Sequence, residues 1–166
     1  MTGGIILKEH GIHMLQYDYW ANMKLLAHVE SLSEDLFHKR MNSVFPSIAE
    51  TFYHIYRGQR IWIKRCIPDL AVNESITSFQ DINEAKTSFT ELHSIMIDSI
   101  KLHYDKLSEV VYQNTKGTTF KNHIDEIMHH LANHGTYHRG NIASMIRECD
   151  YNGTSTDYIQ YLRDMA

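Results

Sequence analysis

Two histidines four residues apart, His134 and His138, lie in an apolar stripe near the C-terminal end of the chain. The stripe consists of residues spaced three or four apart, namely Ile124, Ile127, Leu131, His134, His138, Ile142 and Met145. This spacing places them all on one face of an α-helix, where core side chains point. A buried polar group without a partner costs about 1–3 kcal/mol, and two imidazoles one turn apart can share a metal ion as that partner.

The third ligand of such a site is expected to come from a different helix. Catalytic zinc sites usually have three protein ligands and keep a position for water. His130 lies one turn before His134, but His130 and His138 are separated by about 12 Å of helical rise. Because metal–nitrogen bonds are only about 2.0–2.1 Å long, one straight helix cannot bring all three to one ion.

His54 is the best candidate for that ligand, in a helical segment that also contains Gly58. A glycine within a helix costs about 1 kcal/mol relative to alanine, so Gly58 suggests the close approach of a neighbouring helix or a ligand. His103 is a weaker candidate because it falls near a helix end. For His103 and His13 the simpler interpretation is a core imidazole bonded to a backbone carbonyl, and this alternative stays open for the helical pair as well.

Four long helical segments are expected to position these residues. Few prolines and glycines and long stretches of 3.6-residue periodicity predict an all-α protein, a four-helix bundle. The expected helices span about residues 10–31, 47–67, 78–106 and 120–148. Ser47 and Glu50 have the spacing of a capping box at the start of the second helix. The third helix begins at Ser78 or Asp81.

Two shorter elements complete the expected fold. Residues 110–120 fit either a short β-hairpin or an extended loop around a turn that contains Asn114 and Gly117. A short closing helix is expected from about Asp157.

Composition narrows the possible function. A chain of 166 residues with 43% hydrophobic and 22% charged residues fits one soluble domain over residues 1–166. The formal net charge is −4, without a cluster of basic residues, so nucleic acid is not an expected partner. We expect neither a signal peptide nor a membrane span, and therefore a cytoplasmic protein with Cys66 and Cys149 as free thiols.

Four segments of the chain resemble the DinB family in order and spacing. The run HHLANHGTYHRGNIASMIRE, residues 129–148, resembles the hallmark segment of that family. The other three are YDYWANMKLL (17–26), IAETFYHIYRGQRIW (48–62) and TDYIQYL (156–162), which resemble its first helix, second helix and closing segment. The resemblance covers essentially the whole chain. It implies a four-helix bundle, often dimeric, with a divalent ion held by His54, His134 and His138.

Two positions depart from the family pattern. Asn141 stands where many relatives have glutamine. The stretch Arg57–Arg60 lacks the acidic residue that the family usually has between its helix-two histidine and tryptophan. Some relatives are thiol S-transferases or thiol-dependent isomerases, so the resemblance implies a small-molecule substrate and a low-molecular-weight thiol.

Two classes of function therefore remain open. The first is a metal-dependent enzyme, preferably a thiol S-transferase acting on small electrophiles, with a metal-dependent hydrolase as an alternative. The second is a non-catalytic or stress-related metal-binding dimer, in which a fourth protein ligand would close the site. Zinc and nickel are the preferred ions, because imidazole suits both. Since three histidines must be deprotonated together, metal loss is expected near about pH 5–6.

The remaining expectations concern residues that could support the chemistry, among which none stands out as a general base, and association. Tyr137, Glu50 and His130 lie within a turn of the predicted ligands and are candidates for a supporting role, although ordinary helix-face positions explain each of them. In the first helix, Tyr17 and Trp20 flank a stripe that contains Tyr19, because adjacent residues are about 100° apart. Exposed aromatic rings are typical interface anchors, so a homodimer packed through this helix is expected.

Overall fold

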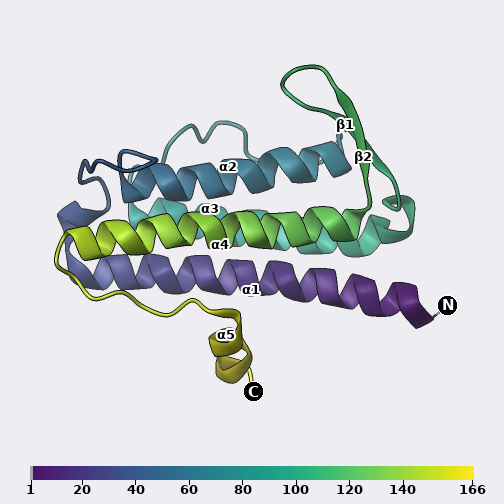
Figure 1. Cartoon of the computed structure of the whole chain (residues 1–166). Helices are drawn as coiled ribbons and strands as arrows, with labels where there is room; N and C mark the ends of the chain where they lie inside the picture. The colour runs from purple at the N-terminus through teal and green to yellow at the C-terminus, as the bar shows by residue number, and fades with distance from the viewer. Residues whose placement is uncertain (1) are drawn as a thin grey trace.

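The fold is a bundle of four long helices with a small hairpin and a short closing helix (Figure 1). A computed structural model describes residues 2–166, with side chains from Lys8 onward except that of Glu34. The helices are α1 (Thr2–Leu32), α2 (Ile48–Cys66), α3 (Ile82–His103), α4 (Ile124–Glu148) and α5 (Tyr158–Asp164). Two 3₁₀ turns, η1 (Glu34–Leu36) and η2 (Tyr104–Lys106), follow α1 and α3. The predicted all-α class is confirmed.

The order of the helices around the bundle, which the sequence left open, follows from their packing. Both α1 and α2 pack against α4 and α3, so α1 and α2 lie diagonally opposite each other. Figure 1 shows α4 running between α1 and α2 along their whole shared length. This arrangement turns the apolar stripe of α4 towards the centre and leaves one of its flanks facing α2. Within residues 2–166 no helix is both long and apolar enough to cross a membrane.

Helix α1 begins at Thr2, eight residues earlier than the predicted start at His10. The charged side chains of Lys8 and Glu9 fit the outer face of this longer helix. The Lys8 ammonium group lies 4.9 Å from the centre of the Tyr104 ring, and such cation–π contacts are favourable on a protein surface. The α1 extension is therefore held by contacts at the far end of α3.

The ends of the other helices follow their capping residues. Ser47 accepts a hydrogen bond from the Glu50 amide at the start of α2, whereas the Glu50 carboxylate accepts one from Arg40 instead of closing the predicted capping box. The complete capping box belongs to α4, where the His123 side chain accepts a hydrogen bond from the Asp125 amide and the Glu126 carboxylate accepts one from the His123 amide. Pattern matching missed it because histidine replaces the usual serine or threonine.

The segment before α4 is the hairpin, with strands β1 (Val110–Gln113) and β2 (Thr119–Asn122) paired antiparallel. Helix α4 consequently begins four residues after the predicted Phe120. Gly117 has φ 78°, a conformation that glycine adopts at no steric cost. Because two strands alone are marginally stable, support comes from α2, where the Trp62 ring lies 4.8 Å from that of Tyr112.

A second, smaller cluster of aromatic rings attaches α5 to α1. Tyr17 is only 4% exposed, and its hydroxyl donates a hydrogen bond of 3.0 Å to the Thr156 carbonyl. Its ring packs edge-on against Tyr158, at 5.1 Å between centroids, and beside Tyr161. The prediction that Tyr17 is an exposed interface anchor is therefore wrong, because the closing helix covers it. Trp20, at the rim of this cluster, is half-buried.

Candidate metal centre

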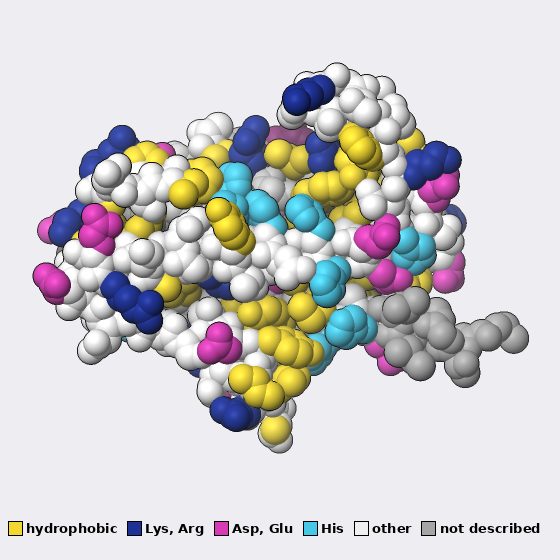
Figure 2. Space-filling view, viewed as in Figure 1, with side chains coloured by type: hydrophobic (Ala, Val, Ile, Leu, Met, Phe, Trp, Pro, Cys, Tyr) yellow, Lys and Arg dark blue, Asp and Glu magenta, His cyan; other side chains and the backbone are white. Residues whose placement is uncertain are grey.

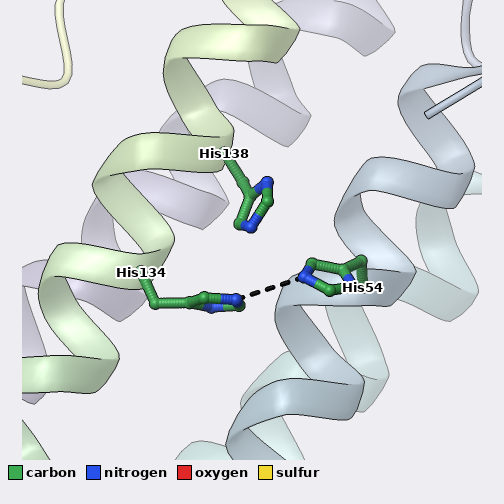
Figure 3. A group of neighbouring side chains, drawn as sticks. All are labelled: His54, His134 and His138. Atoms are coloured by element: carbon green, nitrogen blue, oxygen red, sulfur yellow. Dashed lines mark hydrogen bonds between the residues drawn. The ribbon is translucent and has the colours of Figure 1, made fainter. Parts of the chain in front are cut away.

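His54 of α2 and the pair His134 and His138 of α4 meet between the two helices (Figure 3). One ring nitrogen from each lies within 4.8 Å of the others. The Nε2 atoms of His54 and His134 are 3.2 Å apart, and the centroid of the His138 ring is 4.5 Å from the centroid of each of the other two rings. The structure thus brings together the three histidines that sequence analysis selected, from two helices.

The donor set fits a first-row divalent ion. Four ligands arranged tetrahedrally at about 2.0–2.1 Å place their donor atoms about 3.3 Å from one another. The separation of 3.2 Å between the Nε2 atoms of His54 and His134 has this value already. The ligand atom of His138 lies within 4.8 Å of the other two. The cluster is compatible with metal binding.

Gly58 explains how the two helices come close enough. It lies one turn after His54 on α2, and a Cβ atom built on it would be 3.1 Å from Cε1 of His134. That separation is shorter than an ordinary van der Waals contact. The close approach expected at this glycine is therefore present, and the approaching group is an imidazole of the cluster.

All three imidazoles are neutral at physiological pH. Burial, together with the neighbouring histidines, lowers the pKa of His134 to about 4. Burial and the nearby His54 lower the pKa of His138 to about 4 as well. Burial also lowers the pKa of His54, and the positive charge of Arg57 lowers it further. Neutral imidazole is the form that binds metal ions, so the site is prepared for an ion without first losing protons.

Two neighbours hold the histidine rings in place. The Asn141 side-chain amide lies 3.3 Å from Nδ1 of His138. The structure places the amide nitrogen at this position, and exchanging the amide oxygen and nitrogen lets His138 Nδ1–H donate to the oxygen, the tautomer that leaves Nε2 free to bind a metal ion. The Phe45 ring covers the other side, with centroids 4.5 Å from His54 and 5.5 Å from His138. Asn141, at the position where the resemblance implied glutamine, thus places an amide in contact with His138.

The other histidine candidates have different surroundings. The ring of His130 is exposed and packs against Trp62 at 5.1 Å, outside the three-histidine group. Nδ1 of His103 lies 2.9 Å from the Ser99 carbonyl, which is the bonded position expected for a non-ligand histidine. His13 packs against the rings of α5 instead of a carbonyl, with centroids 5.9 Å from Tyr158.

A cavity of about 720 Å³ opens beside the cluster, and His54 forms part of its wall. Its lining comes from the first turns of α2, the segment before α2 and the loop before α3. The residues are His38, Arg40, Phe45, Ser47, Ala49, Glu50, Tyr53, His54, Arg57, Thr77, Ser78, Phe79 and Gln80. Sequence analysis missed this cavity, because three separate segments build it. Figure 2 shows histidine side chains gathered at the surface near the middle of the face that it draws.

A buried polar network lies next to the cluster on the other side of α4. Arg139 donates hydrogen bonds to Asp18 and Asn22 of α1, at 2.5 and 2.9 Å. Gln59 of α2 donates a third bond, 2.6 Å long, to the second carboxylate oxygen of Asp18. The network joins α1, α2 and α4 at the level of the histidines. Its sequence signal was the pair Asp18 and Asn22, polar residues four apart within an aromatic helix.

Comparison with known proteins gives one consistent result. The sequence model of the DinB family matches residues 7–165. "Protein DinB" of Bacillus subtilis (strain 168) is 30% identical over 164 residues, which cover 94% of this chain and 95% of the relative. "Uncharacterized protein YizA" of the same organism is 24% identical over 127 residues, which cover 76% of this chain and 79% of the relative. On this match, and with the helical bundle that accompanies it, the chain belongs to the DinB family.

Proposed function

We propose that His54, His134 and His138 hold a divalent metal ion, zinc or nickel, and that the protein is a metal-dependent thiol S-transferase acting on small electrophiles. The observation that carries this proposal is the position of three neutral imidazoles beside an open cavity of about 720 Å³. Pockets of about 300–1,000 Å³ are typical for small-molecule ligands. A thiol and a small electrophile would both find room there.

An open site favours an enzyme over a purely structural metal centre. A closed structural site has four protein ligands, whereas a catalytic site has three and an exchangeable position. Among the residues with described side chains, no fourth histidine, cysteine or carboxylate joins the three histidines. The fourth position is thus left for a small molecule.

In the proposed reaction, a thiol loses its proton and its sulfur bonds to an electrophilic carbon, while the leaving group departs with the electrons of its own bond. The ion would supply positive charge that lowers the pKa of the thiol, so that thiolate forms near neutral pH. Of the three residues considered for proton transfer, only Glu50 lines the cavity together with His54. We therefore propose the Glu50 carboxylate as the acceptor of the thiol proton.

The test begins with protein purified without a histidine tag. Elemental analysis is expected to find about one zinc or nickel ion per chain, and a low-molecular-weight thiol should then conjugate with a small electrophile at a rate that depends on that ion. His54→Ala should abolish both, whereas His103→Ala, at a histidine outside the cluster, should abolish neither. Stoichiometric metal combined with metal-dependent ester hydrolysis, and without conjugation, would instead identify a hydrolase.

We also propose that the protein is a homodimer at micromolar concentration. With Tyr17 covered, the candidate interface shifts to the outer face of α5, where Ile159, Leu162 and Met165 are 55%, 37% and 60% exposed. Figure 2 shows hydrophobic side chains gathered where α5 meets the bundle. Apolar surface of this kind commonly marks an interface. Sedimentation velocity should give a dimer, and a monomer across the micromolar range would contradict the proposal without affecting the metal site.

A further inference from the structure

Arg57 lies three residues after His54 on α2 and lines the same cavity. Residues three apart on a helix are neighbours on one side, separated by about 4.5 Å of rise. The Arg57 side chain is exposed to the cavity and to solvent. A cationic group therefore stands about one helical turn from the proposed metal ligand, in the space where a substrate would lie.

The neighbouring cations differ from Arg57, because each has a partner. Arg40 forms an ion pair of 2.9 Å with Glu50, and Lys64 forms one of 2.5 Å with Glu74. Arg60 donates hydrogen bonds of 2.8 and 3.1 Å to two carbonyls of the loop before α3. Among the residues whose side chains the structure describes, the Arg57 guanidinium has no such partner. Its five N–H donors are available to a ligand.

The charge of Arg57 also acts on the histidine cluster, because it lowers the pKa of His54 after the larger effect of burial. Among the charged groups that line the cavity, Arg40 and Glu50 compensate each other, so Arg57 leaves an excess of positive charge. A divalent ion bound at the histidines would add to this excess, although the whole chain carries a net charge of −4. Clefts with an excess of one sign of charge concentrate ligands of the opposite sign. The cavity is therefore suited to an anionic molecule.

We infer that Arg57 binds a carboxylate of one of the two substrates, the thiol or the electrophile, and so sets the specificity of the enzyme. This inference rests on the proposed function. Guanidinium and carboxylate form two parallel hydrogen bonds, which fix orientation as well as position. A carboxylate held there places the rest of the molecule towards His54. A spacer of only a few bonds then separates the carboxylate from the reacting atom. The carboxylate belongs either to the thiol or to the electrophile, and the test distinguishes the two.

The test measures binding without turnover, by titration calorimetry of the protein as purified. One pair of probes is 3-mercaptopropionate and 3-mercapto-1-propanol, which differ in the carboxylate but share the thiol. A second pair, 3-phenylpropionate and 3-phenyl-1-propanol, lacks the thiol. We expect the acid of at least one pair to bind about tenfold more tightly than its alcohol, as charge-assisted hydrogen bonds predict. A preference within the first pair assigns the carboxylate to the thiol, and a preference confined to the second assigns it to the electrophile.

Variants identify the residue responsible. Arg57→Gln should remove the preference for the acid. Arg57→Lys should retain part of it, since lysine keeps the positive charge but cannot form the two parallel hydrogen bonds of a guanidinium. Lys64→Gln removes one positive charge from the same helix and serves as the matched control. In this variant the preference for the acid over the alcohol should be unchanged. Circular dichroism melting curves check that each variant is folded.

The outcomes separate this inference from the proposed function. An equal affinity for acid and alcohol in both pairs, or a preference that survives in Arg57→Gln, would overturn the inference even if the protein conjugates thiols. A preference that depends on Arg57 in a protein without thiol conjugation would support the anion site while contradicting the proposed transferase.

Discussion

His138 and Arg139 are adjacent in sequence, yet they belong to two polar clusters of opposite character. Arg139 is 2% exposed, and its bonds to Asp18 and Asn22 engage side chains that are fully buried in the bundle. His138 faces the other way, towards α2, where three ring nitrogens converge beside a cavity. One cluster contains charges that compensate each other, whereas the other contains neutral acceptors that face one another.

The difference shows what each cluster can do. In the network around Arg139, both carboxylate oxygens of Asp18 accept bonds, so the cluster joins helices and leaves Asp18 little capacity for a ligand. In the histidine cluster, the Nε2 atoms of His54 and His134 are at hydrogen-bonding distance and the ring of His138 faces both, so three neutral imidazoles are arranged where they can share a cation. Gln59 and Arg139 also connect α2 to α4 through Asp18, which fixes the helices that carry the histidines.

The largest expected effect is the loss of metal from the histidine cluster. Changing His54, His134 or His138 to alanine should each abolish stoichiometric metal, because two imidazoles from this group bind an ion far more weakly than three. Inductively coupled plasma mass spectrometry of the purified variants measures this. His130→Ala should retain the ion, and the reverse pattern, with metal lost from His130→Ala and kept by His54→Ala, would show that the site lies along α4 alone.

The second effect concerns the buried network. Asp18→Ala leaves the Arg139 charge buried without its carboxylate, and breaking buried ion pairs in this way typically costs about 3–5 kcal/mol. Urea denaturation of the metal-free protein measures the free energy of unfolding. His134→Ala provides the comparison and should cost clearly less, since it removes a half-buried neutral ring. A loss below about 1 kcal/mol for Asp18→Ala would mean that water or a rearranged side chain compensates Arg139.

The contrast between the clusters also shows what sequence could predict. The histidine cluster was predictable because spacing alone places His134 and His138 on one helical face and excludes His130 from their ion. Gly58 marked the close approach of α2. The network was not predicted, because its partners come from three helices and their order around the bundle is set by long-range packing, which periodicity does not encode.

The helices themselves were predicted in number and type, with errors at their ends. The start of α1 was placed at about His10, although the helix continues back through Lys8 to Thr2, and a lysine on an outer face is compatible with a helix. His123 was not recognised as the cap of α4, because capping rules favour serine, threonine, aspartate and asparagine. Tyr17 was expected at an interface, since nothing in the local pattern shows that a helix 140 residues later covers it. Only the error at Tyr17 comes from a tertiary contact, whereas the other two concern helix ends, which sequence patterns locate least precisely.

A third prediction uses the lowered pKa values of the cluster. Because His134 and His138 have pKa values of about 4, protons compete with the ion only as the pH approaches that value. Metal release is therefore expected at about pH 4–5, lower than the pH 5–6 that ordinary histidines would give. Dialysis at stepped pH followed by elemental analysis measures it.

The same shifts determine how the metal-free protein responds to acid. Since the folded pKa values lie below the unfolded value near 6.5, the unfolded chain binds more protons between about pH 6.5 and 4. The contribution of the neutral imidazoles to stability is complete above pH 6.5 and is lost as the pH falls towards 4. Urea denaturation of the metal-free protein between about pH 6.5 and 4 measures the loss of folding stability separately from metal release. Metal release already complete at pH 6 would contradict the lowered pKa values.

The smallest effect tests the contact between the helices at the histidine cluster. In Gly58→Ala the new Cβ atom would lie 3.1 Å from Cε1 of His134, so the ring must move by a few tenths of an ångström. Alanine favours helix over glycine by about 1 kcal/mol, so the free energy of unfolding should stay the same or rise. Metal affinity should fall by about tenfold, the lower end of the effect of disturbing groups around a metal ligand.

Gly140 provides the matched control for this variant. It lies on α4, two residues after His138, and a Cβ atom built on it would meet nothing within 4 Å. Gly140→Ala should therefore gain the same helix propensity and bind metal as the unmodified protein does. Competition with a chromophoric chelator measures both affinities. If Gly58→Ala and Gly140→Ala bind metal equally well, the close approach at Gly58 serves helix packing and does not constrain His134.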